Sequence, residues 1–394
     1  MTASTVLIAG AGIGGLTAAA MLLLRGIDAE VHEQSTQLGE VGAGIQISAN
    51  AARVYQALGM LERLRAVAAQ PKAYRFRLFD HGEVLQTIVL GDTYEHRHGV
   101  PYLTVHRADL HALLVERVRE LKADAIHLGH RVERIDQDAD GVALHFADGS
   151  RAEGRLLIGG DGIKSVVREH VVGVQAPRFT GDASWRLMVA MDELPPEHRQ
   201  DSVDIWVGPG KHAVTYPLRR GEVLNMVGCV EQRSWDSDSW ISRAPWEELD
   251  TDFRGWNDSI AAVVALARTG DCYRWAMNDR EPITGWTRGR ATLMGDAAHP
   301  TLPYMAQGAA MAVEDAAVLA RAVARDGLEP AALHRYERHR VERTARIVRE
   351  SAANRALFHM DSVQSLRDAF ARRDMSGERN AWLFSYDPIE VPID

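Results

Sequence analysis

Cysteine is scarce in this chain. Cys229 and Cys272 are the only two, and they do not form a CxxC pair. A dithiol redox centre is therefore excluded, and such low cysteine usage is typical of proteins from the reducing cytoplasm. We expect both side chains to be buried in the core, because free cysteine packs as a small apolar residue.

Long apolar runs and an excess of positive charge are also missing. The longest apolar run, Leu16 to Leu24, is too short to cross a bilayer, and the uncharged start does not resemble a signal peptide. The formal net charge is −9, whereas binding to a phosphate backbone needs a basic surface. We therefore predict a cytoplasmic protein that binds neither membranes nor nucleic acid. The basic stretch His334 to Arg340 is interrupted by Glu337, so it predicts a solvated helix face or a dimer contact. We therefore expect a monomer or a homodimer.

No metal site is predicted. The segment from Asp136 to Gly141 begins like a calcium-binding loop, with acids at alternate positions. The twelfth position of such a loop needs a carboxylate, but it is Ala147 here. We therefore interpret the segment as the turn of a hairpin.

Apolar residues are plentiful, at 46% of 394, which is enough for two or three domains. The first residues predict a βαβ unit: a strand from Val6 to Ala9, a glycine-rich turn, a helix from Leu16 to Arg25 and a strand from Ala29 to Glu33. Further helices are expected over residues 51–64, 308–325 and 330–358, with a polar loop after residue 90.

Eight of the nine tryptophans lie between Trp185 and Trp286, where alternating strand patterns are frequent. This composition predicts a separate mixed β-sheet inserted into the nucleotide domain. The fold class is therefore α/β, in three parts. We predict a discontinuous Rossmann-like domain of residues 1–73, 101–175 and 286–330, an inserted sheet domain of residues 74–100 and 176–285, and a C-terminal helical segment of residues 331–394.

Three glycine-rich motifs lie far apart in the chain, and the first follows the N-terminal strand. In Gly10-Ala11-Gly12-Ile13-Gly14-Gly15, the first glycine permits a tight turn, Gly12 lets backbone amides approach a pyrophosphate, and Gly15 lets helix and strand pack closely. The helix N-terminus then favours the phosphates. Glu33 ends the next strand about 20 residues later, where an acid binds the adenosine ribose. This motif alone fits any dinucleotide-binding domain.

The later motifs narrow the class of protein. Gly159-Gly160-Asp161-Gly162 follows an apolar strand and precedes Ser165 and Arg168, while Gly295-Asp296-Ala297-Ala298-His299-Pro300 ends another strand. With all three motifs in this order, the chain resembles the FAD-dependent aromatic hydroxylases that have the p-hydroxybenzoate hydroxylase fold. The resemblance covers nearly the whole chain. It implies bound FAD, with NADH or NADPH as a transient co-substrate, since no second GxGxxG is present.

The resemblance also implies roles for individual residues. Asp161 would contribute to binding both FAD and the nicotinamide cofactor. Asp296, after Gly295, would bind the ribityl chain of FAD, and Arg107 would contact FAD. Gly308 and Ala309 open the next helix, whose N-terminal dipole can stabilise negative charge on reduced flavin. The implied cofactor-binding residues are Gly10, Gly12, Gly14, Gly15, Glu33, Arg107, Asp161, Gly295, Asp296, Gly308 and Ala309.

Within that family, the chain is most similar to hydroxylases of small aromatic acids: 3-hydroxybenzoate 6-hydroxylase, salicylate hydroxylase and 6-hydroxynicotinate 3-monooxygenase. The passages that carry this are Gly39 to Gln46, Asp279 to Ile283, Tyr216 to Arg219 and Met305 to Ala309. Tyr304 matches the 3-hydroxybenzoate enzyme, whereas the other two enzymes have histidine there, which favours a hydroxybenzoate.

The candidate substrate pocket centres on residues 211–217. Their alternation predicts a strand on which His212, Val214 and Tyr216 share one face. A histidine beside a tyrosine could receive a phenol and help to remove its proton, as in similar enzymes; a core tyrosine beside a surface histidine is the alternative. Pro300 would offer its carbonyl near the substrate. The candidate catalytic residues are His212, Tyr216, Pro300 and Tyr304, and the candidate substrate residues are Gln46, His212, Tyr216, Tyr304 and Met305.

The implied reaction is ring hydroxylation of a small hydroxylated aromatic acid. NAD(P)H would reduce FAD, O2 would add to give a flavin hydroperoxide, and its terminal oxygen would attack an electron-rich ring from which water is excluded. A nicotinamide dehydrogenase and a non-enzymatic flavin-binding regulator are the alternatives. A flavin halogenase would need a WxWxIP-type motif, which is absent.

Overall fold

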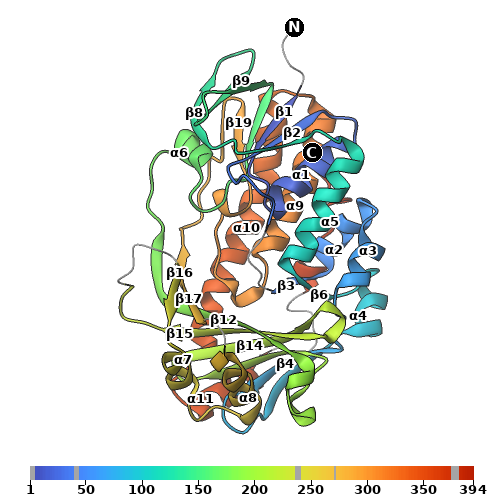
Figure 1. Ribbon diagram of the computed structural model, residues 1–394. Helices are drawn as coiled ribbons and strands as arrows, with labels where there is room; N and C mark the ends of the chain where they lie inside the picture. The colour runs from blue at the N-terminus through green and yellow to red at the C-terminus, as the bar shows by residue number, and fades with distance from the viewer. Residues whose placement is uncertain (1–4, 40–43, 236–240, 270–271, 374–380) are drawn as a thin grey trace.

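Two large sheets dominate the computed structural model, which describes residues 5–39, 44–235, 241–269, 272–373 and 381–394 (Figure 1). A six-stranded sheet lies in the upper part of the view and an eight-stranded sheet in the lower part. The predicted α/β fold class is confirmed. In the described part of the chain, none of the helices combines the length and apolar character needed to span a bilayer.

The six-stranded sheet has the order β18-β19-β11-β1-β2-β7, and every neighbouring pair except β18 and β19 is parallel. Its strands are β1 (Val6–Ala9), β2 (Ala29–Glu33), β7 (Ile126–Leu128), β11 (Leu156–Gly159), β18 (Thr287–Arg288) and β19 (Ala291–Leu293). Parallel strands end at the same edge of a sheet. The three glycine-rich motifs, which follow β1, β11 and β19, therefore meet there.

The eight-stranded sheet has the order β16-β17-β12-β15-β14-β13-β4-β5 and is mixed, because β13 runs parallel to β4. Its strands are β4 (Ala73–Leu78), β5 (Val84–Val89), β12 (Arg178–Ala190), β13 (Val203–Gly208), β14 (Lys211–Leu218), β15 (Val223–Glu231), β16 (Ile241–Ala244) and β17 (Cys272–Asp279). Side chains alternate between the two faces of a strand. Trp185 and Leu187 of β12 pack with α7 (Trp246–Phe253) and α8 (Asp258–Leu266) in one apolar core, which leaves the other face toward the nucleotide sheet.

Helices surround the six-stranded sheet and connect it to the lower one. α1 (Ile13–Leu23) packs against α5 (Arg107–Leu121) and α9 (Gly308–Asp326), and α9 packs against α10 (Pro330–Phe358). The long α10 runs from the upper sheet to the lower one (Figure 1). The remaining strands are β3 (Gly44–Ile47) paired with β6 (Leu103–His106), and the sheet of β8 (Val132–Gln137), β9 (Val142–Phe146) and β10 (Arg151–Gly154). The remaining α-helices are α2 (Ala49–Ala57), α3 (Leu61–Val67), α4 (Gly91–His98), α6 (Val166–Val172), α11 (Val363–Ala371) and α12 (Ala381–Phe384).

Two local predictions were wrong. The helix expected over residues 51–64 is divided into α2 and α3 at Gly59, whose φ of +70° ends the first helix. The polar loop expected after residue 90 is the short helix α4, which ends at Gly99 with a φ of +74°. The sequence does not predict this helix because α4 is polar and has no apolar periodicity. Tyr94 is its single buried side chain.

Several other expectations are confirmed. The βαβ start and the helices from Gly308 and from Pro330 are present, and Cys229 and Cys272 are buried. The acidic segment near residue 138 is the turn between β8 and β9, in which the Asp138 carboxylate accepts hydrogen bonds from the backbone of Asp140 and Gly141.

Candidate active site

A cavity of about 720 Å³ lies between the two sheets, and residues from all three glycine-rich motifs line it. The predicted cofactor-binding residues that line it are Gly10, Gly12, Gly14, Glu33, Arg107, Asp161, Gly295, Asp296, Gly308 and Ala309. Gln46, His212 and Tyr216 line it as well. Glu40 to Ala43, in the passage from Gly39 to Gln46, lie outside the described residues.

The first motif combines a tightly packed turn with an open cradle. A Cβ on Gly15 would lie 2.0 Å from the carbonyl oxygen of Gly10, so α1 can approach β1 only if residue 15 is glycine. A Cβ on Gly12, which caps the N-terminus of α1, would meet no protein atom within 4 Å. The N-terminal end of α1 is therefore open to the cavity.

Glu33 lies at the end of β2 and holds the first motif in place. Its carboxylate accepts hydrogen bonds from the backbone N–H groups of Ala11, at 2.8 Å, and Ser35, at 2.9 Å. The same side chain lines the cavity. The acid is thus orientated by the backbone beside the place where an adenosine ribose would bind.

The second and third motifs are tied together by Arg168. This buried side chain donates from Nη1 to the carbonyl oxygens of Ala297, at 2.6 Å, and Ala298, at 3.1 Å. Asp161 accepts hydrogen bonds from the Val166 N–H and the Ser165 hydroxyl, and so caps α6. The second motif therefore positions the loop that carries Asp296.

Asp296 lines the cavity, and the surrounding protein raises the pKa of its carboxyl group by burial. The charges of His299 and Arg107 act in the opposite direction. Its side chain is nevertheless accessible within the cavity. An enclosed carboxyl group that is open on one side is suited to bind the hydroxyl groups of a ligand.

A buried polar network connects the loop after β19 to the neighbouring helices. Asp315 of α9 accepts hydrogen bonds from the Gly295 N–H at 2.9 Å and pairs with His299 at 2.6 Å and Arg340 at 2.7 Å. These charges and hydrogen bonds outweigh burial and lower the pKa of Asp315 to about 2. The third motif is thereby anchored to both α9 and α10.

The floor of the cavity is formed by three adjacent strands of the eight-stranded sheet. The strand register aligns Arg186 of β12, Val227 of β15 and Val214 of β14 in one row, in which Val227 lies between the other two. His212 pairs with Cys229 in a neighbouring row. His212, Val214 and Tyr216 therefore share the cavity face of β14, as the alternation predicted. Burial lowers the pKa of His212 well below its ordinary value and raises that of Tyr216.

Arg186 is a site residue that the sequence argument missed. Its guanidinium stacks over the Trp275 ring, 4.6 Å from the centroid, and lines the cavity near Tyr216. Its buried Nε has no hydrogen-bond partner among the described residues. Burial lowers the pKa of Arg186, although the group remains a cation at neutral pH because arginine titrates far above it. Alternation along β12 was visible in the sequence, but which face meets the cavity was not.

The loop after the third motif contributes to the cavity in part. Thr301, Pro303 and Ala306 line the large cavity. Tyr304 and Met305 instead line a second cavity of about 330 Å³, and Pro300 is buried and lines neither cavity. The structure therefore brings His212, Tyr216 and Gln46 to one cavity and leaves Pro300, Tyr304 and Met305 beside it.

Tyr304 nonetheless lies close to His212, with ring centroids 4.8 Å apart. Its hydroxyl donates to the buried Asp182, and burial raises the pKa of Tyr304 far above its ordinary value. Gln46 is held by the hydroxyl of Tyr102, which donates to it at 2.6 Å. Both polar side chains are thus fixed by protein contacts.

Comparison with known proteins identifies the family. A family model described as an FAD binding domain matches residues 3–351, so the chain belongs to that FAD-binding family. It is 40% identical over 387 residues to 3-hydroxybenzoate 6-hydroxylase from Polaromonas naphthalenivorans, covering 98% of this chain and 94% of the relative. It is 36% identical over 389 residues to 3-amino-4-hydroxybenzoate 2-monooxygenase PtmB3 from Streptomyces platensis, covering 98% and 97%.

A solved structure gives the same answer. HpxO from Klebsiella pneumoniae, complexed with FAD and uric acid, superposes with a TM-score of 0.85 at 29% identity and covers 99% of this chain and 98% of its own. The protein is therefore an FAD-dependent monooxygenase. Its residues fit FAD, because the open cradle at Gly12, the carboxylate of Glu33 and the enclosed Asp296 all line one cavity.

Proposed function

We propose that this enzyme hydroxylates a small aromatic acid that bears a ring hydroxyl, using NAD(P)H and O2. The observation that carries the proposal is the cavity floor, where the cation of Arg186 shares one sheet face with His212 and Tyr216. A cation and two phenol-binding groups on one surface match a molecule that has a carboxylate and a hydroxyl on one ring.

Arg186 supplies the anchor for the carboxylate. Its side chain is only half-buried and lines the cavity, so its positive charge is available to a ligand there. A guanidinium donates in a planar fork that fits a carboxylate. Stacking on Trp275 holds this fork in a defined plane.

His212 and Tyr216 receive the ring hydroxyl in this proposal. Burial keeps His212 neutral, so one of its ring nitrogens can accept a proton from a phenol. Burial also keeps Tyr216 protonated, so its hydroxyl can donate to the phenolate that results. Removal of this proton makes the ring electron-rich, which electrophilic hydroxylation requires.

In this proposal FAD is bound by Glu33, Asp161, Asp296 and the N-termini of α1 and α9. These groups belong to the FAD-binding domain, which consists of residues 1–73, 101–175 and 286–330. Bound FAD supplies the redox chemistry and the oxygen activation that side chains cannot provide. Residues 74–100 and 176–285 form the substrate part, and the apolar Val214 and Val227 exclude water from the reacting ring.

The direct test uses the purified holoenzyme with a panel of acids: 3-hydroxybenzoate, 3-amino-4-hydroxybenzoate, salicylate and 6-hydroxynicotinate. At least one acid should increase NADH or NADPH oxidation together with O2 consumption, and mass spectrometry should find one added oxygen atom in the product. The panel also separates a hydroxybenzoate from a hydroxypyridine.

Two results would contradict the proposal. NADH oxidation that no acid stimulates would favour a flavin-binding regulator, as would oxidation that yields hydrogen peroxide alone with every acid. Stimulation by uric acid, which lacks a carboxylate, in preference to all four acids would remove Arg186 from its proposed role.

A further inference from the structure

A row of acid–base side chains connects the cavity to the surface behind it. His212 Nδ1 lies 2.7 Å from His359 Nε2, and His359 Nδ1 lies 3.1 Å from Glu231 Oε1. The two imidazoles are 1% and 6% exposed, whereas the Glu231 side chain is 45% exposed. The row thus begins at a residue that lines the cavity and ends at one that water reaches.

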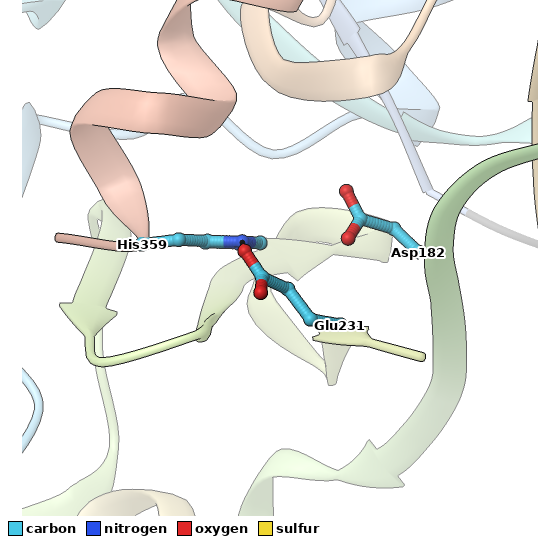
Figure 2. A group of neighbouring side chains, drawn as sticks. All are labelled: Asp182, Glu231 and His359. Carbon is cyan, nitrogen blue, oxygen red and sulfur yellow. Dashed lines mark hydrogen bonds and ion pairs between the residues drawn. The ribbon is translucent and has the colours of Figure 1, made fainter. Parts of the chain in front are cut away.

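The row is assembled from separate parts of the chain. His212 lies on β14, Glu231 ends β15, and His359 follows the last turn of α10. Figure 2 shows the His359 ring approaching Glu231, with Asp182 of β12 beside them. Because Nδ1 of His212 is engaged by His359, Nε2 is the nitrogen available to a ligand in the cavity.

The charged groups around the row are fixed by ion pairs. Arg355 of α10 donates to Asp182 at 2.7 and 2.8 Å and lies 3.2 Å from Glu231. The Tyr304 hydroxyl also donates to Asp182, and Cys229 neighbours His212 on the sheet. These are the titratable and charged groups that face the two imidazoles.

A bound metal ion is a poorer interpretation of this cluster. Possible ligand atoms of Asp182, Glu231 and His359 lie within 4.8 Å of one another. The guanidinium of Arg355 already pairs with both carboxylates, however, so a metal cation would have to displace a resident positive charge. The imidazole pair, which offers one donor and one acceptor, is better suited to proton transfer.

We propose that His359 and Glu231 form a relay that carries the proton of the substrate's ring hydroxyl from His212 to solvent. This inference rests on the proposed function and names the exit for the proton that His212 accepts. The phenol proton passes to His212 Nε2, the Nδ1 proton of His212 passes to His359 Nε2, and the Nδ1 proton of His359 passes to Glu231, which releases it to water. Both imidazoles remain neutral and exchange tautomers. The same steps in reverse, in which Glu231 takes a proton from water and His212 Nε2 returns its proton to the phenolate of the product, restore them before the product leaves.

The environment of the imidazoles fits this exchange. Burial lowers the pKa of His212, and burial also lowers the pKa of His359 although Asp182 and Glu231 act in the opposite direction. Neutral imidazoles pass protons without forming a buried charge, which would be costly.

The test measures proton release when ligand binds to the oxidised holoenzyme, without NADH. Wild type is mixed with 3-hydroxybenzoate in a stopped-flow instrument in weak buffer with phenol red. The same is done for His359→Gln and Glu231→Gln, which keep hydrogen-bonding groups but cannot pass or accept the proton. We expect both variants to slow proton release by about tenfold or more, while their Kd for the ligand changes less than about threefold.

Matched controls separate relay from structure. Glu222→Gln removes an exposed carboxylate just before β15, at the opposite end from Glu231, and should release protons at the wild-type rate. 3-Methoxybenzoate, which has no phenol proton, should release none. Added imidazole should partly restore the rate in His359→Ala and should leave the rate of Glu222→Gln unchanged.

Two different failures can be told apart. If both variants release protons at the wild-type rate with unchanged affinity, the relay is wrong while the proposed function stands. If wild type shows no change in flavin absorbance with any acid of the panel, the proposed function is wrong, and the relay is wrong with it. Because Glu231 is at the surface, Glu231→Gln decides the question even if His359→Gln does not fold.

Discussion

In the proposed function, Arg186 gives the cavity floor its preference for an anion. It stands over Trp275 on the floor formed by β12, β14 and β15, close to Tyr216. Hydrogen bonds to charged groups contribute about 1.5–3 kcal/mol each, which exceeds the net contribution of a neutral one. The proposed selectivity for an acid therefore depends on Arg186.

Replacing this cation by an amide tests that statement. Arg186→Gln should raise the Kd of 3-hydroxybenzoate by about tenfold to a hundredfold, the equivalent of one charged hydrogen bond. The neutral analogue 3-hydroxybenzyl alcohol should bind both proteins almost equally. Titration of the flavin absorbance measures each Kd. Arg178→Gln, on the same strand but 62% exposed, is the control. An equal loss for both ligands would mean that the variant damages the cavity rather than anion binding.

His32 makes the nucleotide sheet sensitive to acid. It packs against two neighbouring imidazoles, with centroid distances of 5.0 Å to His127 and 5.3 Å to His130. Burial, together with the charges of those two rings, lowers the pKa of His32 to about 3, from 6.5 in an unfolded chain. Below pH 6.5 the unfolded chain therefore takes up a proton that the folded protein does not, and stability falls as the pH drops toward 3.

We expect His32→Phe to weaken this dependence. The aromatic ring keeps the stack but cannot titrate, so the loss of unfolding free energy between pH 6.5 and 5 should become smaller by up to about 1.4 kcal/mol per pH unit. Urea unfolding of the holoenzyme at several pH values measures the slope. His81→Gln, whose side chain is 84% exposed, should leave the slope as in wild type. Identical slopes in wild type and His32→Phe would disprove the assignment.

Strand ends and helix starts are the elements that build the cofactor site. β1, β11 and β19 are parallel, so the turns that follow them converge, and α1 and α9 begin at that edge. The glycines of one turn have different tasks. Gly15 allows α1 to touch β1, whereas Gly12 keeps the cradle open.

Two alanine variants should separate these tasks. Gly15→Ala places a methyl group 2.0 Å from the Gly10 carbonyl oxygen, so thermal unfolding should show a less stable fold, by at least about 1–3 kcal/mol. Gly12→Ala meets no protein atom within 4 Å and should fold with a loss of at most about 1 kcal/mol, the cost of a poorer helix cap. Its FAD affinity, from fluorescence on dilution, should nevertheless fall, because the methyl group enters the cavity. Normal FAD affinity in Gly12→Ala would place the cofactor elsewhere.

At the scale of the whole molecule, the cavity joins segments from residue 9 to residue 312. A ligand that contacts all of them binds the folded state alone. FAD at a hundred times its Kd should therefore raise the free energy of unfolding by about 2.7 kcal/mol. Urea unfolding with and without added FAD measures this, and the gain should increase with FAD concentration. An equal gain from NAD, at equal concentration, would contradict an FAD-specific cavity.

How much could be predicted depends on how local the signal is. Each glycine motif reflects a local backbone requirement, so a dinucleotide site and the βαβ start could be predicted from the chain, and the family resemblance of the three motifs together implied FAD. The face shared by His212 and Tyr216 followed from the two-residue period of a strand. Helix α4 could not be predicted because it is polar and shows no apolar periodicity. The division of the helix expected over residues 51–64 depends on a single glycine, Gly59.

The sequence by itself determined the class of cofactor and the order of the elements, because both depend on short-range patterns of glycine and apolar residues. Only the tertiary structure decided which side chains meet across the sheet and the helices: Arg186 beside Tyr216, and His212 against His359, which is 147 residues away in the chain. Such contacts depend on strand register and helix packing, since a register shift of one residue would turn every side chain of β12 to the opposite face.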